Sequence, residues 1–511
     1  MKKFVVALFA GALILAIAAP LFAETYIDGQ VFYRPRIYHN SDFIGNNKST
    51  NDARILPILW LGAGYKAEDY AEAYFRLYTL GAGFALGGAS YGAVGSQDPY
   101  HHVELSNAWF DVKIPGTPVH WRVGRQNQSL GHGFYMNTGG YGGDGMKLWA
   151  PIGPVRVDAG YFKMNELGDF SHDIDQYFAQ VSAPINDKTQ LSFAFQWFEG
   201  RSLNIDTNAS SRPGAPFTHI FTVWDPDVTF DSHIWTLGLA ADGAIPAGAF
   251  TLSYRAEAVY AGGKIVDDVT DEDLAKNQDI SGYAFLLGAT ANFGGIATVT
   301  LEGAYGSGDE RNKDIDSQED LLKYSGSKYE GFRVPMAQWG RSVWFDEWSF
   351  FSGSASGDPF DFGGTFGNGV SKNGKRTAAW NQRGLENLIY VTLGGTFTPL
   401  PPLTLGLDVF KFWAAETTPK GGFDPDSRII YSKKQDSDLG WEIDLTAKWT
   451  MIKNFAVTGA FCPWIPGDYF KVPAGSQFVG DPTDIDDRDE VTGQGGLSWG
   501  WVARANCVFT F

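Results

Sequence analysis

The chain has 511 residues, of which 44% are hydrophobic and 15% aromatic, and a formal net charge of −18. Two cysteines are too few for a disulfide scaffold. After the first segment no apolar run reaches the roughly 18 residues that a membrane-spanning helix needs, which excludes a helical membrane protein. No linker or shift in composition divides the remaining chain, so we expect one domain.

Residues 1–23 form a predicted secretory signal peptide. Lys2 and Lys3 provide a basic start, and an uncharged apolar stretch follows them. This order is typical of export signals. We expect cleavage after Ala23, export through the Sec pathway and a mature domain of residues 24–511.

Five stretches of the mature chain show clear alternation of apolar and polar residues. In one of them, Trp441, Ile443 and Leu445 alternate with Glu442 and Asp444. Successive side chains of a strand point to opposite faces, so this pattern predicts amphipathic strands. The five stretches are 27–37, 190–197, 250–258, 403–409 and 441–449.

A final strand and twelve weaker candidates complete the set. The final strand, Trp499–Phe511, carries an aromatic row and ends on the last phenylalanine, as outer-membrane barrels do. The predicted fold class is therefore all-β: a transmembrane antiparallel β-barrel of about 18 strands, with 16 as the alternative. The weaker candidates are 53–65, 69–80, 103–114, 119–127, 145–150, 154–163, 175–184, 233–242, 281–293, 296–305, 386–398 and 454–463.

The connections between these strands alternate between short and long. Short periplasmic turns and long external loops are the expected asymmetry of such barrels. The short connections are 66–68, 115–118, 151–153, 185–188, 243–248, 294–295, 399–402 and 451–453. The long ones are 39–52, 81–102, 128–144, 164–174, 200–232, 262–280, 306–385, 414–438 and 464–497.

The polar rows of the predicted strands carry charges of both signs in balanced numbers. A barrel of this size is not filled by its own side chains, so we expect these charges to line water. The lumen-lining candidates are Arg34, Arg36, Glu72, Arg76, Arg122, Arg156, Asp158, Arg255, Glu257, Glu302, Glu442, Asp444, Lys448 and Arg504.

The longest connection, 306–385, is too rich in aromatic residues for a solvated segment. It should pack inside the barrel mouth, on neighbouring loops or on a partner. Folded into the mouth, it would form the constriction of the channel. The constriction-loop candidates are Arg333, Trp339, Arg341, Trp344 and Trp348.

Two motifs suggest catalysis or metal binding. Gly88–Gly92 matches the G-x-S-x-G pattern of serine hydrolases, but the strand-to-helix context which that chemistry needs is missing. His101, His102 and His132 have no further ligands at a metal-site spacing, which favours loop or rim histidines. We therefore expect no enzyme activity, no metal and no cofactor.

Two other features suggest a disulfide and a calcium site. In the strand layout Cys462 and Cys507 lie too far apart to bond, so we expect two free thiols. The acidic stretch Asp481–Glu490 lacks the spacing of a helix-loop-helix calcium site, which favours a solvated loop.

Several short motifs resemble the alginate-export family of outer-membrane barrels. They are Arg122–Gln126, Tyr305–Asp309, Gly364–Phe366, Asn387 and Phe410–Trp413. The resemblance implies a porin-like barrel of roughly eighteen strands that passes solutes, an acidic polysaccharide in the named case. The balanced charges and short turns of this chain depart from a polyanion path, so we carry over the fold and the channel role alone.

These observations leave two functions open. The leading hypothesis is an outer-membrane channel for passive diffusion of small hydrophilic solutes or oligosaccharides. The alternative is a barrel that sheathes a partner, such as a multihaem cytochrome. In either case we expect contact with outer-membrane lipid and lipopolysaccharide, insertion by the barrel-assembly machinery through the strand ending at Phe511, and no nucleic-acid partner.

Overall fold

The computed structural model describes most of the mature chain. The described residues are 23–39, 52–68, 70–80, 102–133, 135–136, 143–166, 173–204, 229–267, 278–308, 328–332, 385, 387–416, 419–421, 429–434, 436–468, 477–481, 484–490 and 499–511. Within them, no helix is long and apolar enough to cross a membrane. Residues 1–22 lie outside this set, so the signal peptide and its cleavage site stay predictions.

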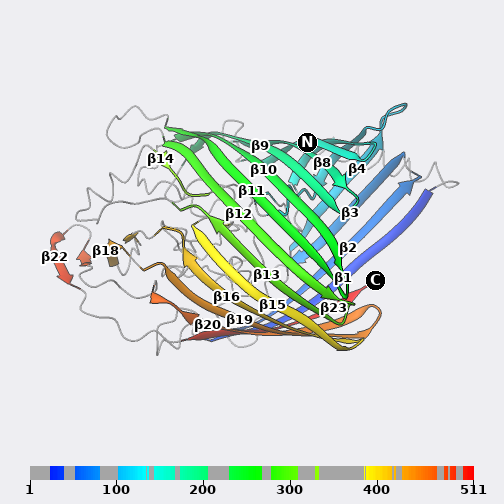
Figure 1. Ribbon diagram of the computed structural model, residues 1–511. Coiled ribbons are helices and arrows are strands. Elements are labelled where there is room, and N and C mark those ends of the chain that lie inside the picture. Colours follow the sequence, from blue (N-terminus) through cyan, green and yellow to red (C-terminus); the bar gives the residue numbers. More distant parts are fainter. Residues whose placement is uncertain are drawn as a thin grey trace.

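Eighteen strands form one closed antiparallel barrel (Figure 1). Each pairs with its neighbour in chain order, and the last strand pairs with the first. The strands are β1 (Ala23–His39), β2 (Asp52–Ala67), β3 (Ala71–Leu80), β4 (His102–Lys113), β5 (His120–Gln126), β6 (Gly143–Ile152), β7 (Val155–Glu166), β8 (Asp173–Asn186), β9 (Thr189–Asn204), β10 (Thr229–Ala247), β11 (Phe250–Asp267), β12 (Gln278–Phe293), β13 (Ala297–Gly306), β15 (Leu388–Leu400), β16 (Leu403–Ala414), β19 (Asp438–Ile452), β20 (Phe455–Pro466) and β23 (Gly500–Thr510). Every one of the predicted stretches overlaps one of these strands, which confirms the fold class.

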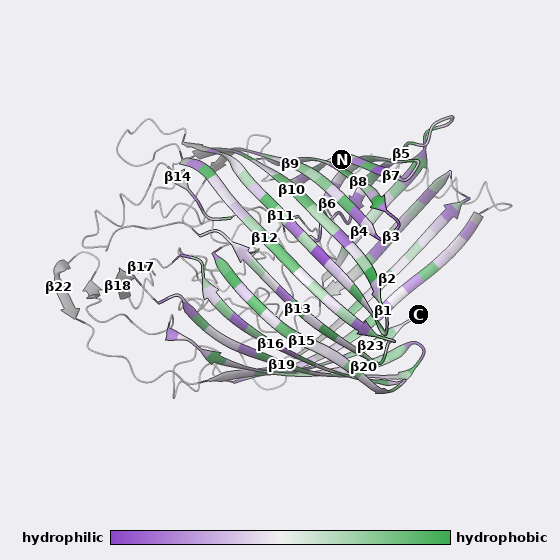
Figure 2. Ribbon diagram, in the orientation of Figure 1, coloured by the Kyte–Doolittle hydropathy of each residue, from purple (hydrophilic) through white to green (hydrophobic). Residues whose placement is uncertain are grey.

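Hydrophobic and hydrophilic residues alternate along the strands of the wall (Figure 2), and their side chains lie on its two faces. In β19, the side chains of Trp441 and Leu445 are exposed on the outside, whereas Glu442 and Asp444 are buried toward the interior. The predicted register of this strand is therefore confirmed. An outer face of large apolar side chains is what contact with lipid requires.

The two ends of the barrel differ as the sequence predicts. All eight short connections link strands at one end, where the C-terminus also lies (Figure 1). One of them turns on Gly294 and Gly295, whose φ angles of 62° and 78° suit glycine in a tight hairpin. Phe511 exchanges two backbone hydrogen bonds of 3.0 Å with Gly29, so the chain end is paired into the wall.

The long-loop end carries further strands. The short strand β14 (Lys328–Tyr329) pairs in parallel with β12. A separate sheet contains β17 (Pro419–Gly421), β18 (Ile429–Lys434), β21 (Gln477–Asp481) and β22 (Asp484–Glu490). The acidic stretch Asp481–Glu490 thus contains the end of β21 and the strand β22, which pair antiparallel. The burial of its side chains lies outside the described part of the chain, so the prediction of a solvated acidic stretch stays a prediction.

Candidate functional site

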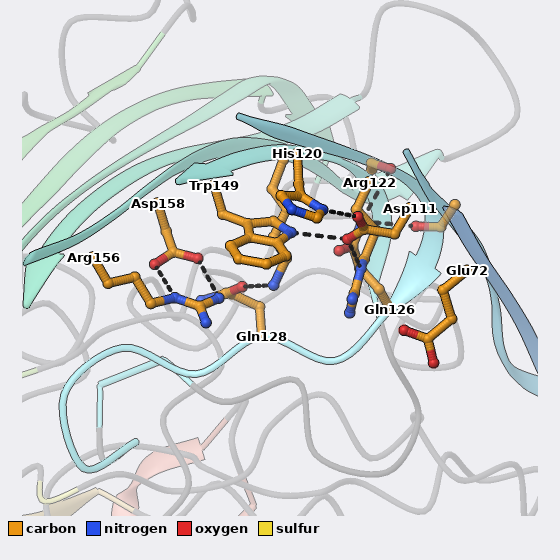
Figure 3. Close-up of polar contacts among 12 residues, drawn as sticks. Glu72, Asp111, His120, Arg122, Gln126, Gln128, Trp149, Arg156 and Asp158 are labelled. Atoms are coloured by element: carbon orange, nitrogen blue, oxygen red, sulfur yellow. Dashed lines mark hydrogen bonds and ion pairs between the residues drawn. The ribbon is translucent and has the colours of Figure 1, made fainter. Parts of the chain in front are cut away.

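The inner wall of β4, β5 and β6 carries a buried carboxylate that is held by three donors. The Asp111 carboxylate accepts hydrogen bonds of 2.8 Å from Arg122 Nε and Trp149 Nε1, and His120 Nδ1 lies 2.8 Å from its other oxygen. Figure 3 shows these side chains pointing toward one another. Arg122 also lies 3.8 Å from the centre of the Trp109 ring, where a guanidinium is attracted to the aromatic face.

A second ion pair lies beside this cluster on β7. Arg156 binds Asp158 through two hydrogen bonds of 2.8 and 2.9 Å (Figure 3). Between the two ion pairs, Lys147 donates a 3.0 Å hydrogen bond to Gln128, which belongs to the connection after β5. Lys147 and Arg122 are register partners, so cations from three neighbouring strands, β5 to β7, lie close together.

A similar pair spans β11 to β13 on the wall. Arg255 and Glu302 form an ion pair, with Nε donating a 2.7 Å hydrogen bond, and Tyr390 of β15 donates a 2.8 Å hydrogen bond to the other carboxylate oxygen. Gly288 lies between them in the register. A Cβ there would be 2.9 Å from the Glu302 carboxylate, so glycine leaves room for the pair.

In these three pairs the cation reaches farther into the lumen than the carboxylate. The side chains of Arg122 and Asp111 are 21% and 5% exposed, those of Arg156 and Asp158 are 52% and 6%, and those of Arg255 and Glu302 are 39% and 1%. At these three pairs the water therefore meets the cation more than the carboxylate. The expectation of balanced charges over the whole lumen stays a prediction.

Other pairs show the opposite order. Asp28 is more exposed than Arg76, which also lies over the Trp60 and Tyr74 rings. In two pairs near the long-loop end, Arg125–Asp144 and Lys411–Asp438, the carboxylates are likewise the more exposed partners. Arg125 shares a strand face with the exposed Trp121, and Lys411 shares one with the exposed Leu407, so these two cations lie on the outer side of the wall and not in the lumen.

The remaining lumen candidates have varied surroundings. Glu72 accepts a 2.8 Å hydrogen bond from Tyr26, and Glu442 and Asp444 are buried. Lys448 is exposed and Arg504 is half-buried. The backbones of Arg34 and Arg36 lie in β1, but their side chains are outside the described part of the chain.

The described part of the connection after β5, residues 127–133 and 135–136, folds into the barrel. Its Leu130, Tyr135 and Met136 are fully buried. Met136 accepts a hydrogen bond from Gln176 on the inner face of β8. The backbone N–H of His132 donates a 2.8 Å hydrogen bond to Glu257 of β11. We call residues 127–133 and 135–136 the inward loop.

The inward loop was not predicted from the sequence, which assigned 128–144 to an external loop and His132 to a loop or rim. The partners of His132 lie 110 and 125 residues away in the chain, so no local pattern identifies them. Gly131-His132-Gly133, an isolated histidine between two glycines, was the one local signal.

The other sequence predictions have mixed outcomes. Cys462 and Cys507 are free thiols, as expected. No group of three metal-ligating side chains occurs among the residues that the structure describes. Gly88–Gly92 and the constriction-loop candidates lie outside those residues, so the role of 306–385 stays a prediction. The constriction-loop candidates that lie outside the described residues are Arg333, Trp339, Arg341, Trp344 and Trp348.

A closed eighteen-stranded barrel with an apolar outer face and a charged inner face defines a porin-like outer-membrane protein. A family model for alginate export matches residues 198–478, more than half of the chain, and the chain belongs to that family. Of the motifs that suggested the family, Arg122–Gln126 lies outside the matched range. The protein is thus an outer-membrane channel by its family and fold, which are those of a channel rather than of an enzyme.

Solved structures show the same fold at low sequence identity. A BenF-like porin from Pseudomonas fluorescens Pf-5 is 11% identical, with 96% of this chain and 98% of that chain covered and a TM-score of 0.50. OccK8 (OprE) from Pseudomonas aeruginosa is 10% identical, and OccAB2 from Acinetobacter baumannii 9%; both cover 96% of this chain and 98% of theirs, with TM-scores of 0.49. A sequence search of curated proteins finds no match.

Proposed function

We propose that the protein lets small hydrophilic solutes and oligosaccharides diffuse passively through a water-filled lumen that favours anions. The observation that carries this proposal is the exposure of Arg122, Arg156 and Arg255 above buried carboxylates. A charged lumen with low-dielectric walls concentrates solutes of opposite sign.

The position of the inward loop strengthens this proposal. The loop begins beside Lys147 and reaches Glu257, the residue two positions from Arg255 on β11. It therefore narrows the lumen at the level of the exposed cations. Solutes that pass this level meet the basic groups at short range, where water screens them least.

The alternative of a sheath around a cytochrome has less support. The inward loop occupies part of the lumen that an inserted partner would need. No catalytic turnover is part of the proposed function. We also propose that the chain is exported through the Sec pathway and that lipopolysaccharide surrounds the wall. The barrel-assembly machinery would insert the protein through the β23 strand.

Charge selectivity tests the proposal. In planar bilayers under a salt gradient, the reversal potential should show anion preference, and Arg156→Gln should reduce the anion-to-cation permeability ratio by roughly a factor of two. Arg156 is suited to the test because its guanidinium is the most exposed of the three and Asp158 stays buried beneath it.

Arg125→Gln is the matched control. Arg125 also pairs with a carboxylate, but Asp144 is the more exposed member of that pair and lies near the long-loop end. Loss of the Arg125 charge should leave the anion preference in place. Cation preference in the unmodified protein would refute the proposed selectivity.

A further inference from the structure

Besides its buried apolar contacts, the inward loop is held against the wall by a histidine between two carboxylates. His132 Nδ1 lies 2.8 Å from Glu257 Oε2, and Nε2 lies 2.9 Å from Asp242 Oδ1. We propose that the His132 imidazolium is a clasp that keeps the Gly131–Gly133 segment of the inward loop docked on β10 and β11, and that its deprotonation at alkaline pH releases this segment and widens the channel. This inference rests on the proposed channel function.

Two carboxylates on opposite sides of the ring favour a doubly protonated imidazole. A neutral imidazole carries one N–H and one lone pair, so it can donate to only one of the two carboxylates. Nε2 is hydrogen-bonded to Asp242, and Nδ1 lies at ion-pair distance from Glu257 without the alignment of a hydrogen bond, so the imidazolium form attracts both carboxylates. Loss of the proton turns one attraction into a repulsion between a lone pair and a carboxylate.

The loop backbone is shaped for close contact with Glu257. Gly131 has a φ of +55°, and a Cβ at that position would be 1.8 Å from Glu257 Oε1. Only glycine allows the chain to cross the carboxylate so closely. The Glu257 side chain is 0% exposed beneath the loop, whereas Asp242 is 58% exposed.

The charges around His132 all favour its protonated form. Glu257 faces it from β11, Asp242 faces it from β10, and Tyr135 is the titratable group of the loop itself. The nearest cation on β11, Arg255, is bound to Glu302. Burial lowers the pKa of His132, but the hydrogen bonds and charges of Glu257 and Asp242 outweigh it, so the pKa is raised above its ordinary value.

The direction of the pH effect follows from this shift. A raised pKa in the docked state means that the clasp is fully formed below the ordinary histidine pKa and is lost as pH rises through the docked value. The opening therefore falls on the alkaline side of about pH 6.5. The buried contacts of Leu130 and Met136 do not depend on the proton, so these parts of the loop stay docked and the release is confined to Gly131–Gly133. The strand pairing of the barrel does not depend on the proton either, so the barrel itself should stay intact.

The test is single-channel conductance of the full barrel in planar bilayers between about pH 6 and pH 10. The unmodified protein should show a conductance increase of roughly twofold on the alkaline side, since conductance follows the open cross-section. His132→Gln, which is neutral, should have the high conductance at every pH. His132→Arg, which stays charged, should have the low conductance throughout.

His233→Gln is the matched control, because His233 lies on β10 but not at the loop. It should keep the pH response of the unmodified protein. A pH response that persists in His132→Gln, or its absence in the unmodified protein, would overturn the clasp while leaving the channel intact. An absence of any conductance would instead count against the proposed function on which the clasp rests.

Discussion

Leu445→Arg should block assembly of the barrel, whereas Thr446→Arg should leave the fold intact. Leu445 lies on the outer face at the middle of β19, and a lipid-facing arginine near the midplane costs about 2–4 kcal/mol in such barrels. The inward neighbour Thr446 would place its arginine in water. Migration on gels before and after heating distinguishes folded from unfolded barrels.

The two variants differ by one position and one strand face, so they control each other. A one-residue shift in register would exchange the two faces. Greater damage from Thr446→Arg would therefore mean that β19 is rotated relative to the wall described above. Altered conductance in a folded Thr446→Arg variant would support its place in the lumen.

Asp111→Ala should destabilise the barrel by about 2–4 kcal/mol, because three part-buried donors lose their hydrogen-bond acceptor and each unmet donor costs roughly 1 kcal/mol or more. Arg122, His120 and Trp149 would all lose their common acceptor. The midpoint of urea unfolding in lipid vesicles measures the change.

Asp158→Ala is the matched comparison for Asp111→Ala. Both carboxylates are almost fully buried, but the partner of Asp158 is the half-exposed Arg156, whose guanidinium can be hydrated after the change. Its loss should cost about 1 kcal/mol or less, as for an exposed pair. Equal costs for the two variants would contradict the view that partner burial sets the penalty.

The sequence predicts the wall of this protein because the wall obeys a local rule. Alternation at 441–449 is enough to place Leu445 outside and Asp444 inside, and the short connections then fix the order of the strands. Pairing of β23 with β1 follows once the final strand is recognised.

The site is less predictable because it depends on contacts between distant parts of the chain. His132 meets Glu257 only after six strands, β6 to β11, have formed the curved wall between them. The charge that the lumen presents to water is also hard to predict from the sequence. Arg156 and Asp158 count equally in the sequence, and only the structure shows that one is exposed and the other covered.

The central claim is that the barrel conducts by itself, and single-channel recording of the purified protein in planar bilayers tests it most directly. We predict discrete conductance steps whose current varies linearly with voltage, without any partner present. A folded barrel that is silent in the bilayer and co-purifies with a haem protein in fixed proportion would contradict the channel and favour the sheath.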